Sequence, residues 1–183
     1  MKQSTKIIPD IRLHYPDLVI TSVATSGILD AVRTMNTGDL IMRVGRPVLI
    51  VPATAQALKL DRVVVGWKDT RETQRAIAGA LPLLKLAKDV SVVEIAAEED
   101  MAVARKHLDD VVGWLKRHGI AAKAIASLST GNDAARLDGL AQEYDADVIV
   151  GGAYGHNRMR EWALGGVTRD LLLRADRCCL LSH

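Results

Sequence analysis

The sequence contains no phenylalanine, and aromatic residues make up only 3% of its 183 residues. A chain of this length can bury a sizeable core, which must therefore consist mainly of valine, leucine, isoleucine and alanine. Only two cysteines are present, Cys178 and Cys179, and as chain neighbours they suit neither an ordinary disulfide nor a metal site. We expect them to be small apolar strand residues in a reducing compartment.

An excess of charge of one sign is also lacking, because 24 lysines and arginines face 22 aspartates and glutamates, for a net charge of +2. The basic residues form no run that could follow a nucleic-acid backbone or an anionic membrane, so we expect neither as a partner. No apolar stretch reaches the roughly 18 residues of a membrane-spanning helix, and residues 1–10 lack the apolar centre of a secretion signal. These absences predict a cytoplasmic protein.

An internal repeat is the most informative feature that is present. Residues 38–51 (GDLIMRVGRPVLIV) align without a gap on residues 169–182 (RDLLLRADRCCLLS), and residues 15–22 (YPDLVITS) resemble residues 144–152 (YDADVIVGG). Each copy predicts a strand, a connection with a helix, and a final strand. Only the second copy is preceded by enough chain to complete a domain. We therefore predict an incomplete module over residues 1–57 and a complete one over residues 58–183.

The second of these modules alternates strands with helices. Near-continuous apolar runs predict strands covered on both faces, and apolar residues at helical spacing predict the helices between them. Asp69 is the candidate N-cap of the first helix, with Glu72 three positions on, and Pro82 is expected to kink or divide that helix. The alternation predicts an open parallel α/β sheet with helices on both faces. The expected strands cover residues 62–67, 90–97, 120–127, 145–152 and 177–182, and the expected helices residues 69–87, 98–118 and 132–144.

Glycines cluster in residues 151–168 (GGAYGHNRMREWALGGVT), directly after an expected strand. Glycine is costly to order on folding, so the cluster indicates either turns or a backbone that passes close to a phosphate. The order of five strands and four helices from Arg62 to His183, with the spacing Gly152-x2-Gly155-x9-Gly165, resembles the universal stress protein family. The whole chain resembles a tandem member of that family whose first module has lost its front half.

The resemblance implies a sheet order of 3-2-1-4-5, with a reversal between the first and fourth strands. Open parallel sheets bind ligands beside such a reversal, at the carboxyl ends of the strands. The implied ligand is ATP or a related adenine nucleotide, with Mg²⁺ only alongside it, and its phosphates would lie at a helix N-terminus. The implied binding residues are Gly66, Trp67, Lys68, Gly151, Gly152, Gly155, Gly165, Gly166, Val167 and Thr168.

Two positions depart from the pattern of the family's binding members. Lys68 stands where those members carry an aspartate, and a lysine cannot accept a hydrogen bond from a ribose hydroxyl. Gly166 stands where they carry serine or threonine, two positions before Thr168. Two functions therefore stay open: a small binding and signalling module that responds to an adenine nucleotide, or a nucleotide-independent dimeric scaffold or partner-binding stress protein. In the second, the cleft is degenerate and closed by Trp67, Lys68 and Tyr154.

No set of residues predicts an enzyme. The sequence has neither a dinucleotide fingerprint nor a phosphate-binding loop of the P-loop type. His107 and Asp110 share an expected helix but lack a third metal ligand, and Ser182 and His183 lack an acidic partner. We expect nucleotide hydrolysis to be at most slow and incidental.

The first copy of the repeat predicts an assembly device. Residues 46–51 (RPVLIV) repeat the expected fifth strand at residues 177–182, and fifth strands in the family resemble an edge that pairs antiparallel between modules. An unpaired apolar edge invites association. We therefore expect the two strands to pair within the chain or across a dimer, and a homodimer through the fifth-strand edges is the predicted assembly.

Overall fold

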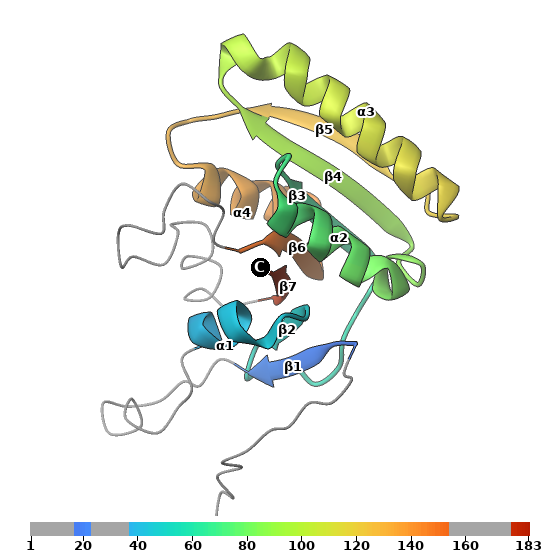
Figure 1. Ribbon diagram of the computed structural model, residues 1–183, viewed down its shortest axis with the longest axis vertical. Helices are drawn as coiled ribbons and strands as arrows, with labels where there is room; N and C mark the ends of the chain where they lie inside the picture. Colours follow the sequence, from blue (N-terminus) through green and yellow to red (C-terminus); the bar gives the residue numbers. More distant parts are fainter. Residues whose placement is uncertain (1–16, 23–36, 154–176) are drawn as a thin grey trace, which may run out of the picture.

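Seven strands form one sheet in the computed structural model, which describes residues 17–22, 37–153 and 177–183 (Figure 1). Their order across the sheet is β1-β2-β7-β6-β3-β4-β5. The strands are β1 (Val19–Ser22), β2 (Val48–Val51), β3 (Arg62–Trp67), β4 (Asp89–Ala96), β5 (Lys123–Leu128), β6 (Val148–Gly152) and β7 (Cys178–Ser182). The described helices are α1 (Thr37–Val44), α2 (Arg71–Leu84), α3 (Met101–Arg117), which a short 3-10 helix (Glu98–Asp100) precedes, and α4 (Asp133–Glu143).

The order predicted for the complete module is confirmed. Its five strands are β3, β4, β5, β6 and β7, and they lie in the order β5-β4-β3-β6-β7 with every pair parallel. The sheet is nevertheless larger than the five strands predicted, because β1 and β2 continue it beyond β7. The partial repeat thus adds to the same sheet.

Alternating side chains of the central strands divide the core between the two faces of the sheet. Val63 and Val65 of β3 belong to a cluster that contains buried residues of α2 and α3, whereas Val64 belongs to one that contains Ile41 of α1 and Leu137 of α4. All three valines are buried, and full burial of a valine contributes roughly 1.5–3 kcal/mol. The near-continuous apolar runs therefore arise from cover on both faces, as predicted.

The seam between the two copies of the repeat is an antiparallel pairing of β2 with β7 within the chain. Leu49 lies opposite Leu180, and both side chains are buried. Pro47 precedes β2 and lies so close to α2 that a Cβ built on Gly79 would overlap its ring. A proline lacks the amide hydrogen that a ladder needs, so its place just before the strand agrees with its chemistry. The pairing predicted for residues 46–51 and 177–182 is therefore present inside one chain.

Helix α2 begins one residue later than the sequence suggested. Its N-cap is Thr70, whose side-chain oxygen accepts a hydrogen bond from the backbone nitrogen of Thr73 at 3.4 Å. The predicted cap, Asp69, instead accepts a hydrogen bond from the side chain of Gln74. Both Asp69 and Thr70 have cap-forming side chains, and the sequence does not fix which of two neighbours takes that role. The helix continues through Pro82 to Leu84, so it is not divided there.

Both cysteines are buried strand residues with free thiols, as predicted. Burial raises the pKa of the Cys178 thiol, and the nearby negative charge of Asp147 adds to that shift. A raised pKa keeps the thiol protonated and therefore a poor nucleophile at neutral pH. In the described ranges, no helix combines the length and the apolar character that crossing a membrane requires.

Candidate functional site

The direction of the sheet connections reverses between β3 and β6, which lie side by side and parallel. Gly66, near the end of β3, is the register neighbour of Gly151 in β6. The carboxyl ends of these two strands therefore meet at the switch point where ligands bind in open α/β sheets. The sequence-predicted residues Gly66, Trp67, Gly151 and Gly152 are brought together here, with Lys68 directly after β3.

Gly152 is held against the start of helix α2. A Cβ built on it would lie 2.7 Å from the backbone nitrogen of Thr73 and 2.9 Å from the carbonyl carbon of Glu72. These are backbone atoms of a helix and have no room to move aside. The close approach of α2 thus accounts for this glycine without any ligand.

Gly66 and Gly151 face the opposite side of the sheet, toward α4. A Cβ on Gly66 would meet the side chain of Leu137 in α4 at 2.9 Å, so that leucine fills the space above Gly66. Of the described residues, a Cβ on Gly151 would meet only Leu181, at an ordinary contact distance of 3.8 Å. Gly151 is therefore the glycine of this group beside which the described residues leave room.

Trp67 and Gly66 point to opposite faces because side chains alternate along a strand. The Trp67 ring packs against the cluster of α2 and α3, away from the side that Gly66 faces. Trp67 therefore lies on the opposite face of the sheet from Gly66 and Gly151, although the sequence placed all three in one cleft. Lys68 is exposed, and its ammonium group makes no ion pair with a residue of the described segments.

A buried carboxylate beside Trp67 was missed by the sequence reasoning. Glu94 of β4 is the register neighbour of Trp67, is 6% exposed, and has one carboxylate oxygen 3.2 Å from Nδ1 of His107 in α3. Its other oxygen and the indole nitrogen of Trp67 are buried without a hydrogen-bond partner among the described residues. The sequence signal for this buried carboxylate is a glutamate within an otherwise apolar run. His107, which the sequence excluded as a metal ligand, is the residue that contacts this carboxylate.

The remaining predicted binding residues, Gly155, Gly165, Gly166, Val167 and Thr168, lie outside the described residues, as does Tyr154. The spacing of the glycines after Gly152 is therefore a property of the sequence alone. Within the segments that the structure describes, no group of three or more histidines, cysteines, aspartates or glutamates could hold a metal ion.

The order of the strands and the switch point define an open α/β fold with helices on both faces. No protein-family model matches the sequence, and the search of curated proteins gave no significant match. Solved structures with this fold include universal stress proteins, as the sequence suggested.

Three of these structures come from Archaeoglobus fulgidus. A universal stress protein matches with a TM-score of 0.55 and 22% identity, over 67% of this chain and 98% of that one. A complex of the universal stress protein from this organism with dAMP matches with a TM-score of 0.52 and 22% identity, over 68% of this chain and 99% of that one. A universal stress protein from strain DSM 4304 matches with a TM-score of 0.67 and 15% identity, over 93% of this chain and 62% of that one. The chain has the fold of the universal stress proteins.

Proposed function

We propose that the protein is a small, non-catalytic binding and signalling module of the universal stress protein type, which binds an adenine nucleotide weakly at the switch point between β3 and β6. The observation that carries this proposal is the pairing of Gly66 with Gly151 at the carboxyl ends of those strands. The described residues leave room beside Gly151 on the α4 side, and the glycine spacing that begins at Gly152 continues in the sequence as in nucleotide-binding members. The complex of a similar structure with dAMP adds support.

The domain division belongs to the same proposal. Residues 58–183 would form the complete module and residues 1–57 a partial repeat of its last part. The lengths of two matches support this division. One similar structure, matched over 98% of its own length, covers 67% of this chain, and a second covers 93% of this chain. A location in the cytoplasm stays a prediction from the sequence.

The second candidate is a nucleotide-independent scaffold or partner-binding protein. It is favoured by Gly152, whose lack of a side chain is explained by the approach of α2, and by Lys68 in the place of an aspartate. In this case the glycines serve packing rather than a ligand. Nucleotide binding by the purified protein decides between the two candidates.

Isothermal titration calorimetry with ATP and Mg²⁺ should give a dissociation constant of about 1 μM or weaker. Weak binding is expected because the switch point keeps its glycines but lacks the carboxylate at position 68 and the hydroxyl at position 166. Gly165→Val should abolish the heat of binding by placing a side chain where the phosphates approach. A nucleotide that stays tightly bound through purification would contradict the expected weakness, and no binding at all would favour the scaffold.

Lys68→Ala should weaken the binding of ATP by about two- to fivefold and leave that of adenosine almost unchanged. An exposed ammonium group near phosphates contributes only a few tenths of a kcal/mol to about 1 kcal/mol. The same calorimetric titration with both ligands measures the difference. Equal losses for ATP and adenosine would exclude a phosphate contact of Lys68.

The fold limits which surface a homodimer can use. In the complete module the fifth strand is β7, and its outer edge pairs with β2 of the same chain. A homodimer of chains folded in this way must therefore use another surface.

A further inference from the structure

Strand β5 is the edge strand at the end of the sheet away from β1 and β2, and it has few features that would prevent pairing with another strand. β5 pairs with β4 on one side, and no strand of the described segments pairs with its other side. Its sequence, KAIASL, contains one charge, and that residue, Lys123, forms an ion pair of 2.6 Å with Asp89 of the neighbouring β4. Leu128, at the other end of β5, is 51% exposed. Edge strands are normally blunted by charges, prolines or bulges, so this edge is suited to pairing.

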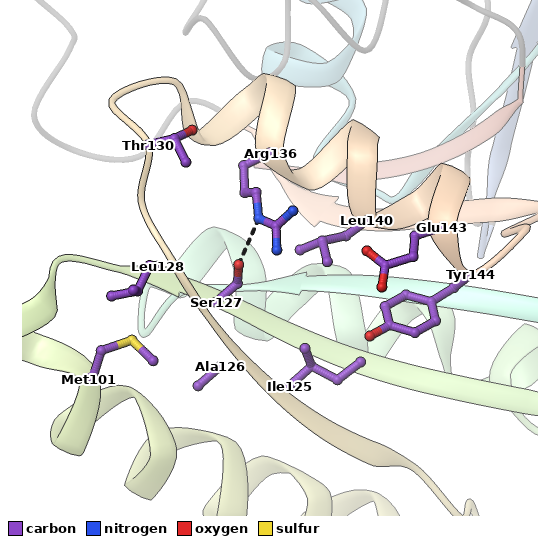
Figure 2. A pocket seen from close by; sticks show the side chains of 10 residues that line it. All are labelled: Met101, Ile125, Ala126, Ser127, Leu128, Thr130, Arg136, Leu140, Glu143 and Tyr144. Carbon is purple, nitrogen blue, oxygen red and sulfur yellow. Dashed lines mark hydrogen bonds between the residues drawn. The ribbon is translucent and has the colours of Figure 1, made fainter.

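A hollow of about 460 Å³ lies beside this edge, between β5 and α4 (Figure 2). Ile125 and Ser127 line it from the strand. From α4 it is lined by Arg136, Leu140 and Glu143, which follow one another at helical spacing and so form one stripe. Figure 2 shows Leu140 between the two charged side chains along the helix. The edge strand and the hollow thus form one continuous surface with an apolar centre and two charges.

The two charges of this stripe lie seven residues apart on α4 and do not pair with each other. The Arg136 side chain donates a hydrogen bond from Nε to the Oγ of Ser127 at 2.8 Å, which fixes the direction of the guanidinium. Its terminal nitrogens and the carboxylate of Glu143 make no hydrogen bond or ion pair within the described part of the chain. The positive group is near the start of α4 and the negative group is at its end.

We propose that this surface is the interface with a second copy of the chain, formed by antiparallel pairing of the two β5 strands. A two-fold axis perpendicular to the sheet relates such copies, so their α4 helices lie on the same face and run in opposite directions. The two hollows then join, and Arg136 of each copy faces the partner's Glu143. In an isologous interface each contact occurs twice, so the reversed order of the two charges makes the surface complementary to itself.

A second copy is favoured over an unrelated peptide because residues 123–143 of one chain supply the unpaired edge and both charges. Arg136 precedes Glu143 along α4, so an antiparallel second copy presents the two charges in the complementary order. The edge of β7, which the sequence predicted for a dimer, is already paired with β2, and the opposite edge of the sheet is the four-residue strand β1. The interface also covers the exposed Leu128 and pairs the backbone groups of β5 that no described strand pairs with. This interface requires no bound nucleotide.

Charge reversal tests the interface directly. Sedimentation velocity over a range of concentrations should show a dimer for the unchanged protein. Arg136→Glu and Glu143→Arg should each raise the dimer dissociation constant about tenfold or more, because two attractive pairs become two repulsive ones. An equimolar mixture of the two variants should recover the dimer, since the mixed pair has complementary charges at both contacts. Lys106→Glu, an equal change of charge on the exposed side of α3, should leave the dissociation constant unchanged.

Several results would overturn the proposal. They are a monomer at every concentration, a dimer unaffected by either charge reversal, and a mixture that fails to recover the dimer although both variants show the circular dichroism of the folded protein. If a charge-reversed variant does not fold, Leu128→Lys gives the answer, because it adds a charge at the edge without removing the hydrogen bond of Arg136 to Ser127. A dimer that keeps its dissociation constant in Leu128→Lys does not use this edge.

Discussion

Gly152→Ala should lower the free energy of unfolding by about 1–3 kcal/mol, and Gly152→Val by more. The added Cβ would lie 2.7 Å from the backbone nitrogen of Thr73 and 2.9 Å from the carbonyl carbon of Glu72, so the start of α2 must move away from the sheet. Urea denaturation followed by circular dichroism measures the change.

The neighbouring Gly151 provides the matched control. Among the described residues a Cβ there meets only Leu181, at 3.8 Å, so Gly151→Ala should change the free energy of unfolding by less than about 1 kcal/mol, in the stabilising direction. Equal destabilisation by the two alanine substitutions would mean that α2 does not press on Gly152. If nucleotide binding is lost in Gly151→Ala while stability is kept, the room beside this glycine belongs to the ligand.

Removal of residues 1–57 should leave a module that folds but aggregates or changes its oligomeric state. The deletion exposes the edge of β7 and removes Val48, Leu49 and Ile50, all of them buried. Burial of each of these side chains contributes roughly 1.5–3 kcal/mol, and the apolar surface that they cover would become accessible to other chains. Multi-angle light scattering on the full-length and truncated proteins measures the outcome.

A shorter deletion, of residues 1–16, removes none of the described strands and is the control for this experiment. It should leave the oligomeric state as it is in the full-length protein. If the protein without residues 1–57 also keeps the same number of chains per particle and stays soluble, the partial repeat has no role in assembly.

The architecture could be predicted because it depends on patterns within short segments. Runs such as residues 63–65 are apolar at successive positions, as a strand covered on both faces requires in an alternating α/β sequence. The repeat related residues 46–51 to the fifth strand, and the family resemblance implied that such strands pair antiparallel. The sequence did not predict a seven-stranded sheet, because pairing within a chain and pairing between chains require the same apolar edge. Local chemistry likewise did not distinguish Asp69 from Thr70 as the N-cap of α2.

The candidate site was predicted in part. The meeting of Gly66 with Gly151 follows from the order of the strands, and the opposite direction of Trp67 could have been read from the two-residue period of a strand. The sequence could not show why residue 152 is a glycine, because Gly152 contacts a helix almost 80 residues earlier in the chain. Glu94 was hidden for a similar reason, since its partner His107 lies on a different element.

The antiparallel seam between β2 and β7 has a consequence for how the protein tolerates dilution. Leu49 and Leu180 align in the repeat and also lie opposite each other, so an approximate two-fold axis passes between them. Between separate chains, such a contact forms and dissolves according to protein concentration. Inside one chain it is the closure of a loop, whose entropic cost grows only slowly with length. The seam therefore persists at any concentration at which the chain is folded, whereas a contact between copies at β5 is lost once the protein is sufficiently dilute.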